Sequence, residues 1–501
     1  MGVGQMTATP EARIRRLNDH SHRPDGDFVL YWMVANRRPK SNFALQRAAE
    51  IAASLEKPLL VLEGLRSDYR WASDRLHSFV IQGMRDNERW FAKKPAHYIA
   101  YLEPSPGAGR GLLETLGTRA AAVVSDDFPA FFLPRMLAAA APRIPVGFEA
   151  VDSNGMYPMR ATDRVFTTAA SFRRHLQKEL PPHLDVLPWE DPLQKKRLPK
   201  PTEALEGWLR KTLTKAWAPA NREALEDPVL SAFPIDHSVG KVGFEGGFRA
   251  AEAALGKFLD QRLSRYTEGR NHPDDDSASG LSPWLHFGHV SVHQIFAAIT
   301  GDEGWTRHDL AKKAHGSRTG YWNLSEASEA FFDELITWRE IGFNMCAHRS
   351  DYTELSSLPA WAIATIDAHR KDARPTVYSA EAMEAAETGD DIWNAAQRQL
   401  VREGRMHNYL RMLWGKKVYE WSPTPEEALE RLVHLNNKYA VDGRNPNSYS
   451  GIFWCFGRYD RAWGPERKIF GKLRYMSSDA TRRKLKLKHY LARYGDQPTL
   501  L

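Results

Sequence analysis

The segment FFDELITWRE (331–340) opens a tryptophan-rich stretch that runs to Trp463 and dominates the second half of the chain. Seven of the chain's 16 tryptophans lie in this stretch, interleaved with Glu, Asn, His and Arg. A plain helical core is filled mainly with Leu, Ile and Val, whereas a site that stacks planar groups uses aromatic side chains. The pattern therefore favours a functional helical region, with a plain aromatic core as the alternative.

The size and composition of the chain bound its class. A length of 501 residues is enough for two or three domains. Two cysteines, Cys346 and Cys455, exclude a disulfide framework and a thiolate zinc site, and they fit a reducing cytosol. There is no run of 18 apolar residues, so no membrane span is expected. Residues 1–24 lack the apolar core of a signal peptide, and we expect a flexible leader there.

Positive charge is concentrated at the C-terminal end. The net charge is +7, and residues 465–495 hold ten Lys or Arg against Glu466 and Asp479, an excess of eight. A basic cluster is the usual electrostatic footprint of a partner with a phosphate backbone. A solvated helix face that keeps the protein in solution is the alternative, and charge alone does not separate the two.

Residues 25–186 read as an α/β domain. Apolar runs bounded by polar residues alternate with helical patterns such as 41–55, which predicts a parallel sheet with helices on both faces and a Rossmann-like layout. No GxGxxG follows the first run, so the standard dinucleotide fingerprint is absent. The sheet edge either holds an accessory ligand or serves only for docking. The predicted strands are DFVLYWMV (27–34), PLLVLEGL (58–65), HYIAYLE (97–103), AAAVVSDD (120–127) and IPVGFEAVD (144–152).

A linker and a helical region follow. LPWEDPLQKKRLPKPTE (187–203) is rich in Pro and Lys and lacks periodicity, which marks a boundary. Helical patterns then extend over 204–495. One helix start is well signalled, with Thr424 as the N-cap, Pro425 at N1 and Glu427 closing a capping box. The polar residues 301–328 are expected to form a surface insertion.

Two short constellations could carry chemistry. In SASGLSPWLHFGHVS (277–291), Ser279 and Ser282 can cap a helix that has Pro283 at N1, which makes either a phosphate site or an ordinary cap. Glu334 and Trp338 are four residues apart and share one helix face. They form either an ordinary boundary pair or, in a dry pocket, an acid whose raised pKa lets it hydrogen-bond a carbonyl.

The segment MHNYLRMLWGKKVYEW (406–421) places aromatic and charged residues on one helix. Trp414 and Trp421 lie two turns apart, and Arg411 lies one turn before Trp414, where it could pair with Asp442. Trp393 lies on the preceding predicted helix. Three tryptophans in a row either relay electrons or form plain aromatic core.

Five collinear blocks resemble class II cyclobutane pyrimidine dimer photolyases of the photolyase/cryptochrome superfamily. The similarity runs from about 263 to 476 and is weaker in YWMVANRRPKSNFAL (31–45). The blocks are LSPWLHFGHVS (281–291), FFDELITWREI (331–341), DIWNAAQRQLVREGRMHNYLRMLWGKKVYEW (391–421), LNNKYAVDGRNPNSYSGIFW (435–454) and DRAWG (460–464).

The resemblance implies a fold and an activity. It implies an α/β Rossmann-like N-terminal antenna domain and an all-α C-terminal FAD-binding domain. It implies light-driven repair of cyclobutane pyrimidine dimers by electron transfer from photoexcited FADH⁻, on double- or single-stranded UV-damaged DNA with the dimer flipped out. A deazaflavin (8-HDF) antenna, or none, is expected, as are no metal, no membrane partner and a monomer. For a bacterial protein, the expected location is the cytoplasm, with association with the nucleoid through DNA binding. A cryptochrome-like photoreceptor and a non-enzymatic DNA-binding helical protein are the alternatives.

The resemblance also assigns residues. Catalytic roles fall to Glu334, Asn436 and Met412, and the photoreduction triad is Trp414, Trp393 and Trp421. The expected FAD contacts are Tyr266, Ser279, Leu281, Ser282, Trp284, Gln397, Arg411 and Asp442. The expected lesion and DNA contacts are Arg270, Asn271, Trp338, Trp454, Arg461, Trp463 and Arg474.

Several positions depart from the family pattern. Ala278 stands before the cradle serine, Leu413 stands where some relatives are aromatic, and Asn437 replaces an acidic residue. Residues 41–43 replace a DNW-like segment, so no antenna residues are assigned. The segment WCFGRYDRAW (454–463) is one residue shorter than expected, and the insertion at 301–328 is longer. These departures bear on the antenna site and on the surface expected to face DNA.

Overall fold

The computed structural model describes residues 7–194 and 196–495, which fall into two compact units. The sheet unit comprises Met1–Thr162, Leu180–Leu255 and Leu281–Arg307. The helical unit comprises Asp163–Glu179, Gly256–Gly280 and His308–Leu501. Each unit is therefore discontinuous in sequence, unlike the contiguous division expected on either side of a linker at 187–203.

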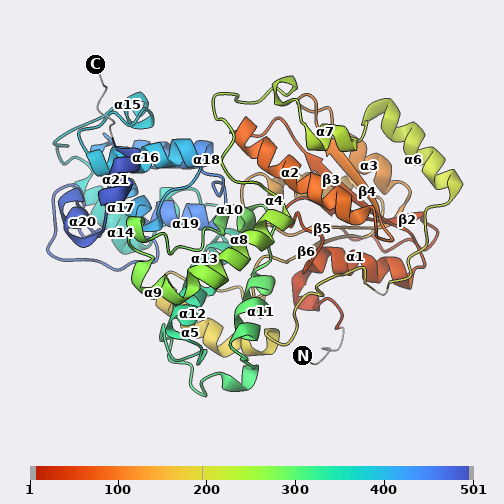
Figure 1. Ribbon diagram of the computed structural model, residues 1–501, viewed down its shortest axis with the longest axis horizontal. Coiled ribbons are helices and arrows are strands. Elements are labelled where there is room, and N and C mark those ends of the chain that lie inside the picture. Colours follow the sequence, from red (N-terminus) through yellow and green to blue (C-terminus); the bar gives the residue numbers. More distant parts are fainter. Residues whose placement is uncertain (1–6, 195, 496–501) are drawn as a thin grey trace. The chain divides into compact units, whose positions relative to one another are not determined.

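The sheet unit is built on six strands in the order β1-β6-β5-β2-β3-β4 (Figure 1). Strands β2 to β6 pair in parallel, which confirms the predicted parallel sheet, and β1 pairs antiparallel with β6. All five predicted strands are present. The strands are β1 (Ile14–Arg16), β2 (Phe28–Met33), β3 (Leu59–Leu65), β4 (His97–Leu102), β5 (Ala120–Asp126) and β6 (Phe148–Val151).

Strand β1 corrects the expectation of a flexible leader over 1–24. Residues 1–6 of that leader lie outside the described residues, but Ile14 pairs with Val151 at the edge of the sheet. The guanidinium of Arg13 donates to the carbonyl oxygens of Gly155 (3.1 Å) and Met156 (2.8 Å). Backbone pairing and a buried arginine therefore fix this segment, because a terminal strand in a sheet is tied down.

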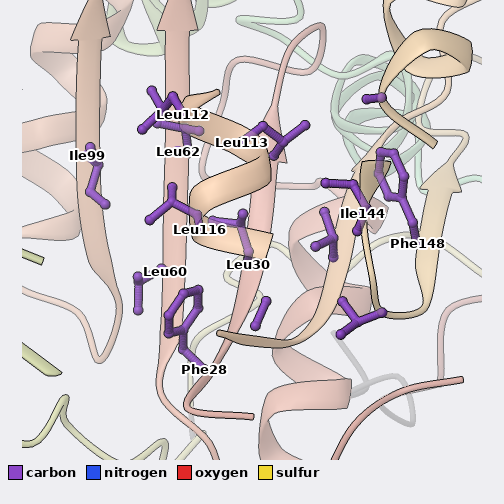
Figure 2. Packing of buried hydrophobic residues seen from close by; sticks show 14 of the residues in the cluster. Phe28, Leu30, Leu60, Leu62, Ile99, Leu112, Leu113, Leu116, Ile144 and Phe148 are labelled. Atoms are coloured by element: carbon purple, nitrogen blue, oxygen red, sulfur yellow. The ribbon is translucent and has the colours of Figure 1, made fainter. Parts of the chain in front are cut away.

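Both faces of the sheet are covered, because side chains alternate along each strand. Phe28 and Leu30 lie in one hydrophobic cluster with Leu116 of α3 (Leu112–Gly117), as Figure 2 shows. Val29, Tyr31 and Met33 lie in another cluster with the apolar face of α1 (Phe43–Ser54). This is the layered packing that the sequence predicts.

The first helix after the linker, α6 (Glu203–Ala216), also covers the sheet. Its residues Leu205, Leu209 and Leu213 belong to the same cluster as Phe28. Its apolar stripe explains why the sheet unit extends beyond the linker, since that stripe must be buried against another layer. The other helices of this unit are α2 (Asp74–Phe91), α4 (Leu133–Ala140), α7 (Arg222–Glu226), α10 (Ser282–His286) and α11 (Val292–Asp302), and α8 (Phe248–Gln261) begins in it.

The carboxyl edge of the sheet is ordered by a buried carboxylate. Asp126, the last residue of β5, accepts hydrogen bonds from the Tyr31 hydroxyl and from the backbone N–H groups of Val34, Ala35 and Asn36, all at 2.8–3.0 Å. One side chain thus satisfies the donors of the loop that follows β2.

The helical unit is formed by short to medium helices (Figure 1). At the start of α18 the Thr424 hydroxyl accepts from the Glu427 N–H at 3.2 Å, which confirms the predicted N-cap. Among the described residues no helix is long and apolar enough to cross a membrane. The helices of the helical unit are α5 (Ala169–Glu179), α9 (Tyr266–Gly269), α12 (Glu326–Phe332), α13 (Arg339–His348), α14 (Ala360–His369), α15 (Ala380–Glu384), α16 (Asp391–Glu403), α17 (Asn408–Trp421), α18 (Pro425–Tyr439), α19 (Pro446–Trp454), α20 (Ser478–Lys484) and α21 (Lys488–Tyr494).

The predicted cap near Ser282 is wrong. Helix α10 is five residues long and begins at Ser282, and its N-cap is Leu281, which makes no side-chain capping hydrogen bond. Leu281 already has near-helical dihedrals (φ −80°, ψ −9°), whereas a capping serine requires an extended backbone. Gly280 precedes it with a φ of +69°, which turns the chain just before the helix.

Candidate functional site

Glu334 and Trp338 lie in a wide helical turn. Helix α12 continues into a π-helical segment, η8 (Asp333–Trp338), and then into α13. The sequence predicts the two side chains on one face of an α-helix; the structure makes the turn π-helical. Asp333, Leu335, Ile336 and Thr337 are buried, and Glu334 and Trp338 remain partly exposed. Wide turns of this kind occur often at functional sites.

A buried ion pair anchors this turn. The guanidinium of Arg173, on α5, donates from Nε to Asp333 Oδ1 at 2.6 Å and from its terminal nitrogen to Oδ2 at 2.9 Å. The two side chains are only 7% and 10% exposed. Bidentate geometry gives such a pair directional rigidity, so the position of Glu334 is set by the residue before it.

Glu334 is paired with Arg270. Arg270 donates to Glu334 Oε1 at 2.7 Å, and its guanidinium carbon lies 5.4 Å from the ring centroid of Tyr266. Burial raises the pKa of Glu334, and the positive charge of Arg270 works against that rise. Both side chains stay about one-third exposed, so a ligand can reach them. Asn271, the next residue, is exposed.

The loop that carries Arg270 and Asn271 is held by the C-terminal segment. The carboxylate of Asp274 accepts from the backbone N–H groups of His489 (3.1 Å) and Tyr490 (2.7 Å) at the start of α21. Lys486 pairs with Asp275 at 3.0 Å. The C-terminal region therefore supports the Arg270–Glu334 pair.

The basic tail is partly used inside the protein. Four of the ten cations in residues 465–495 form ion pairs with carboxylates. These are Arg474 with Asp460, Arg482 with Asp391, Lys486 with Asp275 and Arg493 with Glu403. The charge excess therefore overstates the positive surface, because intramolecular pairing is invisible in a composition.

Three tryptophans form a row in the order 414, 393, 421. The rings of Trp414 and Trp393 are nearly parallel (8°) with centroids 6.3 Å apart, and Trp421 meets Trp393 edge-on at 5.5 Å. The Trp393 indole N–H donates to the Trp414 carbonyl oxygen, and the Trp414 N–H donates to Gln397 Oε1, both at 3.0 Å. The predicted row is therefore present, and its role in electron transfer stays a prediction.

Arg411 lies one turn before Trp414 on α17 and pairs with Asp442. Arg411 donates to Asp442 Oδ1 at 3.3 Å, which confirms the expected pair. Arg411 keeps 25% and Asp442 13% of its side chain exposed. On α18, Asn436 donates from Nδ2 to Asn437 Oδ1 at 3.1 Å, and this bond fixes the orientation of the Asn436 amide.

A second aromatic and cationic group, the Trp454 cluster, comprises Lys416, Trp454, Asp460, Trp463 and Arg474. The guanidinium carbon of Arg474 lies 5.6 Å from the ring centroid of Trp454 and 3.9 Å from that of Trp463. Asp460 accepts from the Arg474 Nε at 2.8 Å and from the Trp463 indole N–H at 3.1 Å. The cluster brings together three of the expected DNA contacts, Trp454, Trp463 and Arg474. The Asp460 carboxylate fixes two of them, Trp463 and Arg474, relative to each other.

Arg461 completes this edge of the helical unit. Its side chain is exposed, and its guanidinium carbon lies 4.4 Å from the Trp463 ring centroid. Met412 is half-buried on α17.

The expected FAD contacts near α10 divide between the two units. Tyr266 and Ser279 belong to the helical unit, where Tyr266 is buried against Phe258 and Phe331. Leu281, Ser282 and Trp284 belong to the sheet unit. There Trp284 donates its indole N–H to the Glu245 carbonyl oxygen at 2.9 Å and packs on Phe79. These contacts give Trp284 a structural role within the sheet unit.

The chain was compared with known proteins. It is 32% identical over 484 residues to a protein named deoxyribodipyrimidine photo-lyase from Methanothermobacter thermautotrophicus, covering 96% of this chain and 97% of that protein. The chain belongs to the deoxyribodipyrimidine photo-lyase family. A photo-lyase from Oryza sativa subsp. japonica is 33% identical, with 96% and 90% of the two chains covered. No family model matches the chain.

Solved structures support the photolyase fold. A bacterial class III photolyase from Agrobacterium tumefaciens aligns with a TM-score of 0.63 at 18% identity, covering 94% of this chain and 86% of that chain. A Synechocystis cryptochrome aligns with a TM-score of 0.66 at 15% identity, covering 93% and 88%. These likenesses show a fold shared by photolyases and cryptochromes.

Three polar side chains of the helical unit offer groups that fit the flavin that the family implies. A flavin ring carries hydrogen-bond donors and acceptors along one edge. The guanidinium of Arg411, the carboxylate of Asp442 and the amide of Asn436 offer matching groups, and the first two are partly exposed. The aromatic row shares α17 with Arg411, because Trp414 lies on the same helix.

Sequence reasoning missed Lys416. It is 1% exposed, and its spacing of three from Leu413 and from Tyr419 places it inside the apolar stripe of α17. The sequence therefore contained the signal that identifies Lys416, which is a lysine at a core position of a helix.

Proposed function

We propose that this protein is a class II DNA photolyase that splits UV-induced cyclobutane pyrimidine dimers in light. Bound FAD, in its reduced form FADH⁻, supplies the light-driven electron that opens the cyclobutane ring. The observation that carries the proposal is the partly exposed ion pair between Arg270 and Glu334, which lies on a π-helical turn, within a chain of the photo-lyase family.

Glu334 is the hydrogen-bonding acid of the proposed site. Burial raises its pKa, which favours a carboxyl group that can donate a hydrogen bond from Oε to a pyrimidine carbonyl. Arg270 supplies a positive charge beside the position where negative charge develops on the lesion. Asn436 is proposed to fix a protonation state near the flavin through its oriented amide.

The aromatic residues of the helical unit are proposed to hold the lesion and the DNA around it. Trp338 and Trp454 stack on the flipped dimer, and Met412 packs beside them. Flipping costs a few kcal/mol and costs less for a badly stacked lesion, which favours damaged sites. Trp463 and Arg461 occupy the opened duplex, where an exposed guanidinium can meet phosphates.

The Trp414–Trp393–Trp421 row is proposed to conduct electrons from the surface toward the flavin. Its near-contact ring spacings of 6.3 and 5.5 Å support short steps. The Trp414 N–H donates to an amide oxygen and the Trp393 N–H to a backbone carbonyl oxygen, and both acceptors favour positive charge on the indole that donates to them.

An antenna chromophore is proposed at the carboxyl edge of the sheet. Parallel sheets bind ligands at this edge, and the loop held by Asp126 borders it. A deazaflavin such as 8-HDF is the proposed ligand, and an excitation spectrum of the purified protein tests it. We also propose that the protein is a monomer and that it associates with the nucleoid. Sedimentation with and without DNA measures the oligomeric state.

The decisive experiment is a light-dependent repair assay on an oligonucleotide with one cyclobutane dimer, and in parallel on one with a (6-4) photoproduct. We expect repair of the first only, under blue light and after reduction of the flavin. A protein that binds flavin and shows photochemistry but repairs neither lesion would instead support a cryptochrome-like photoreceptor, a class that shares this fold.

A further inference from the structure

Two adjacent lysines on α17 have opposite environments. Lys417 is half-buried and forms ion pairs with Glu420 (2.9 Å) and Asp390 (4.0 Å). Lys416 is 1% exposed, and its Nζ donates to the Cys455 carbonyl oxygen at 2.7 Å. Among the described residues it forms no ion pair with a carboxylate, and its hydrogen bond goes to a neutral backbone carbonyl.

This arrangement is unfavourable for folding. Burial lowers the pKa of Lys416 from 10.5 to about 8, so the ammonium is still the main form at pH 7. An apolar side chain of similar length would fill the same space without desolvating a charge. Costly buried charges of this kind concentrate at functional sites.

The contacts of Lys416 point to one neighbour. Its Nζ lies 5.2 Å from the ring centroid of Trp454, within the range of a cation–π interaction. The carbonyl that it binds belongs to Cys455, the C-cap residue of α19, which ends at Trp454. A single ammonium thus holds both the indole ring and the backbone that follows it, and a cation is favourable at the C-terminus of a helix.

We propose that Lys416 is the positioning residue of Trp454, fixing the indole as a stacking platform for the pyrimidine dimer. This inference rests on the proposed function, because it assumes that Trp454 contacts the lesion. Trp454 is half-buried, so it keeps an exposed part for stacking while Lys416 lies in the protein interior. The ammonium also brings positive potential to a place where negative charge develops on the lesion.

The neighbours of Lys416 give the proposal a pH dependence. Burial raises the pKa of the Cys455 thiol to about 11. Burial works against ionisation of Asp460, but hydrogen bonds from Arg474 hold the pKa of that carboxyl below its usual range. Lys417, on the same helix, is paired with Glu420. Among these groups, Lys416 is the one whose pKa is shifted into the range between pH 7 and 9.

The test measures binding in the dark by the purified flavoprotein, to an oligonucleotide with one cyclobutane dimer and to its undamaged counterpart. K416M keeps the length of the side chain and removes the charge; K417M is the matched control on the next residue. We expect K416M to bind the lesion about tenfold more weakly, to bind undamaged DNA as the wild type does, and to unfold at a higher denaturant concentration. K417M should keep the wild-type preference for the lesion.

A pH series separates positioning from simple packing. Lesion affinity of the wild type should fall as the pH rises from 7 to 9.5, whereas K416R, which stays charged, should not show that fall. Equal lesion affinity of K416M and wild type would overturn the proposal, as would an equal loss of lesion preference in K417M. If K416M does not fold, a flat wild-type profile across this pH range overturns it. If the wild type repairs dimers but K416M has the same lesion affinity as the wild type, only this inference fails. If the wild type neither prefers the lesion nor repairs it, the proposed function fails.

Discussion

Replacing Lys416 by methionine is expected to stabilise the protein at neutral pH. The pKa of Lys416 falls from 10.5 to about 8 because its ammonium is buried. At about 1.4 kcal/mol per pH unit, this corresponds to a penalty of about 3 kcal/mol for keeping the charged form folded. Attraction to the Trp454 ring offsets about 1 to 2 kcal/mol, so a net gain of about 1 to 2 kcal/mol is expected.

The sign of the pH dependence follows from proton linkage. Between pH 8 and 10.5 the unfolded chain still binds a proton at Lys416 while the folded protein does not. The contribution of this group to the unfolding free energy therefore rises with pH across that window. The K416M variant lacks this rise, so its advantage over the wild type should shrink as the pH increases from 8 to 10.

Equilibrium unfolding in guanidinium chloride at pH 7, 8, 9 and 10 measures this difference. Other titrating groups cancel when K416M is compared with wild type at each pH, and K417M controls for the loss of a positive charge on α17. A midpoint of K416M below that of wild type at pH 7, or a difference that does not change with pH, would refute the reasoning. The first result would mean that the ammonium contributes more in packing and hydrogen bonding than its burial costs.

Four further changes test other parts of the site. Glu334→Ala should lower the repair yield while the flavin absorbance is retained, and unchanged repair would remove its assigned role. Trp414→Phe should block photoreduction of oxidised flavin but spare repair by enzyme reduced beforehand; intact photoreduction would place the electron path elsewhere. Arg461→Ala should weaken DNA binding and reduce the salt slope by about one, so an unaltered slope would place this charge away from phosphates. Arg173→Met should cost about 3 to 5 kcal/mol in denaturant unfolding because Asp333 is left buried and unpaired, and a loss below 1 kcal/mol would contradict that.

Much of the fold could be predicted from local patterns. Short apolar runs with alternating helices give the five parallel strands, since parallel strands buried on both faces are apolar throughout. Thr424 caps α18 as expected because hydroxyl, Pro425 and Glu427 act within one turn. The heptad spacing of Trp414 and Trp421 places both on the same side of α17, where each lies near Trp393.

Other features depend on contacts between distant segments. Strand β1 exists because Ile14 meets Val151, 137 positions later, and three residues of strand carry no pattern of their own. The π-helical turn at Glu334 is accompanied by a buried ion pair between Asp333 and Arg173, which lies 160 residues earlier. The sequence around Asp333 does not indicate that Arg173 is its partner, and the sequence around Arg173 does not indicate Asp333.

The sequence by itself determined the kinds of groups available: a parallel sheet, a tryptophan-rich helical region, an acid next to an aromatic residue, and a basic tail. The tertiary structure decided which charges remain for a ligand. It pairs Arg474 with Asp460 and leaves Lys416 buried beneath Trp454 without a carboxylate partner among the described residues. The reason is physical, because burial and pairing set the energy of a charge, and both are properties of the folded chain.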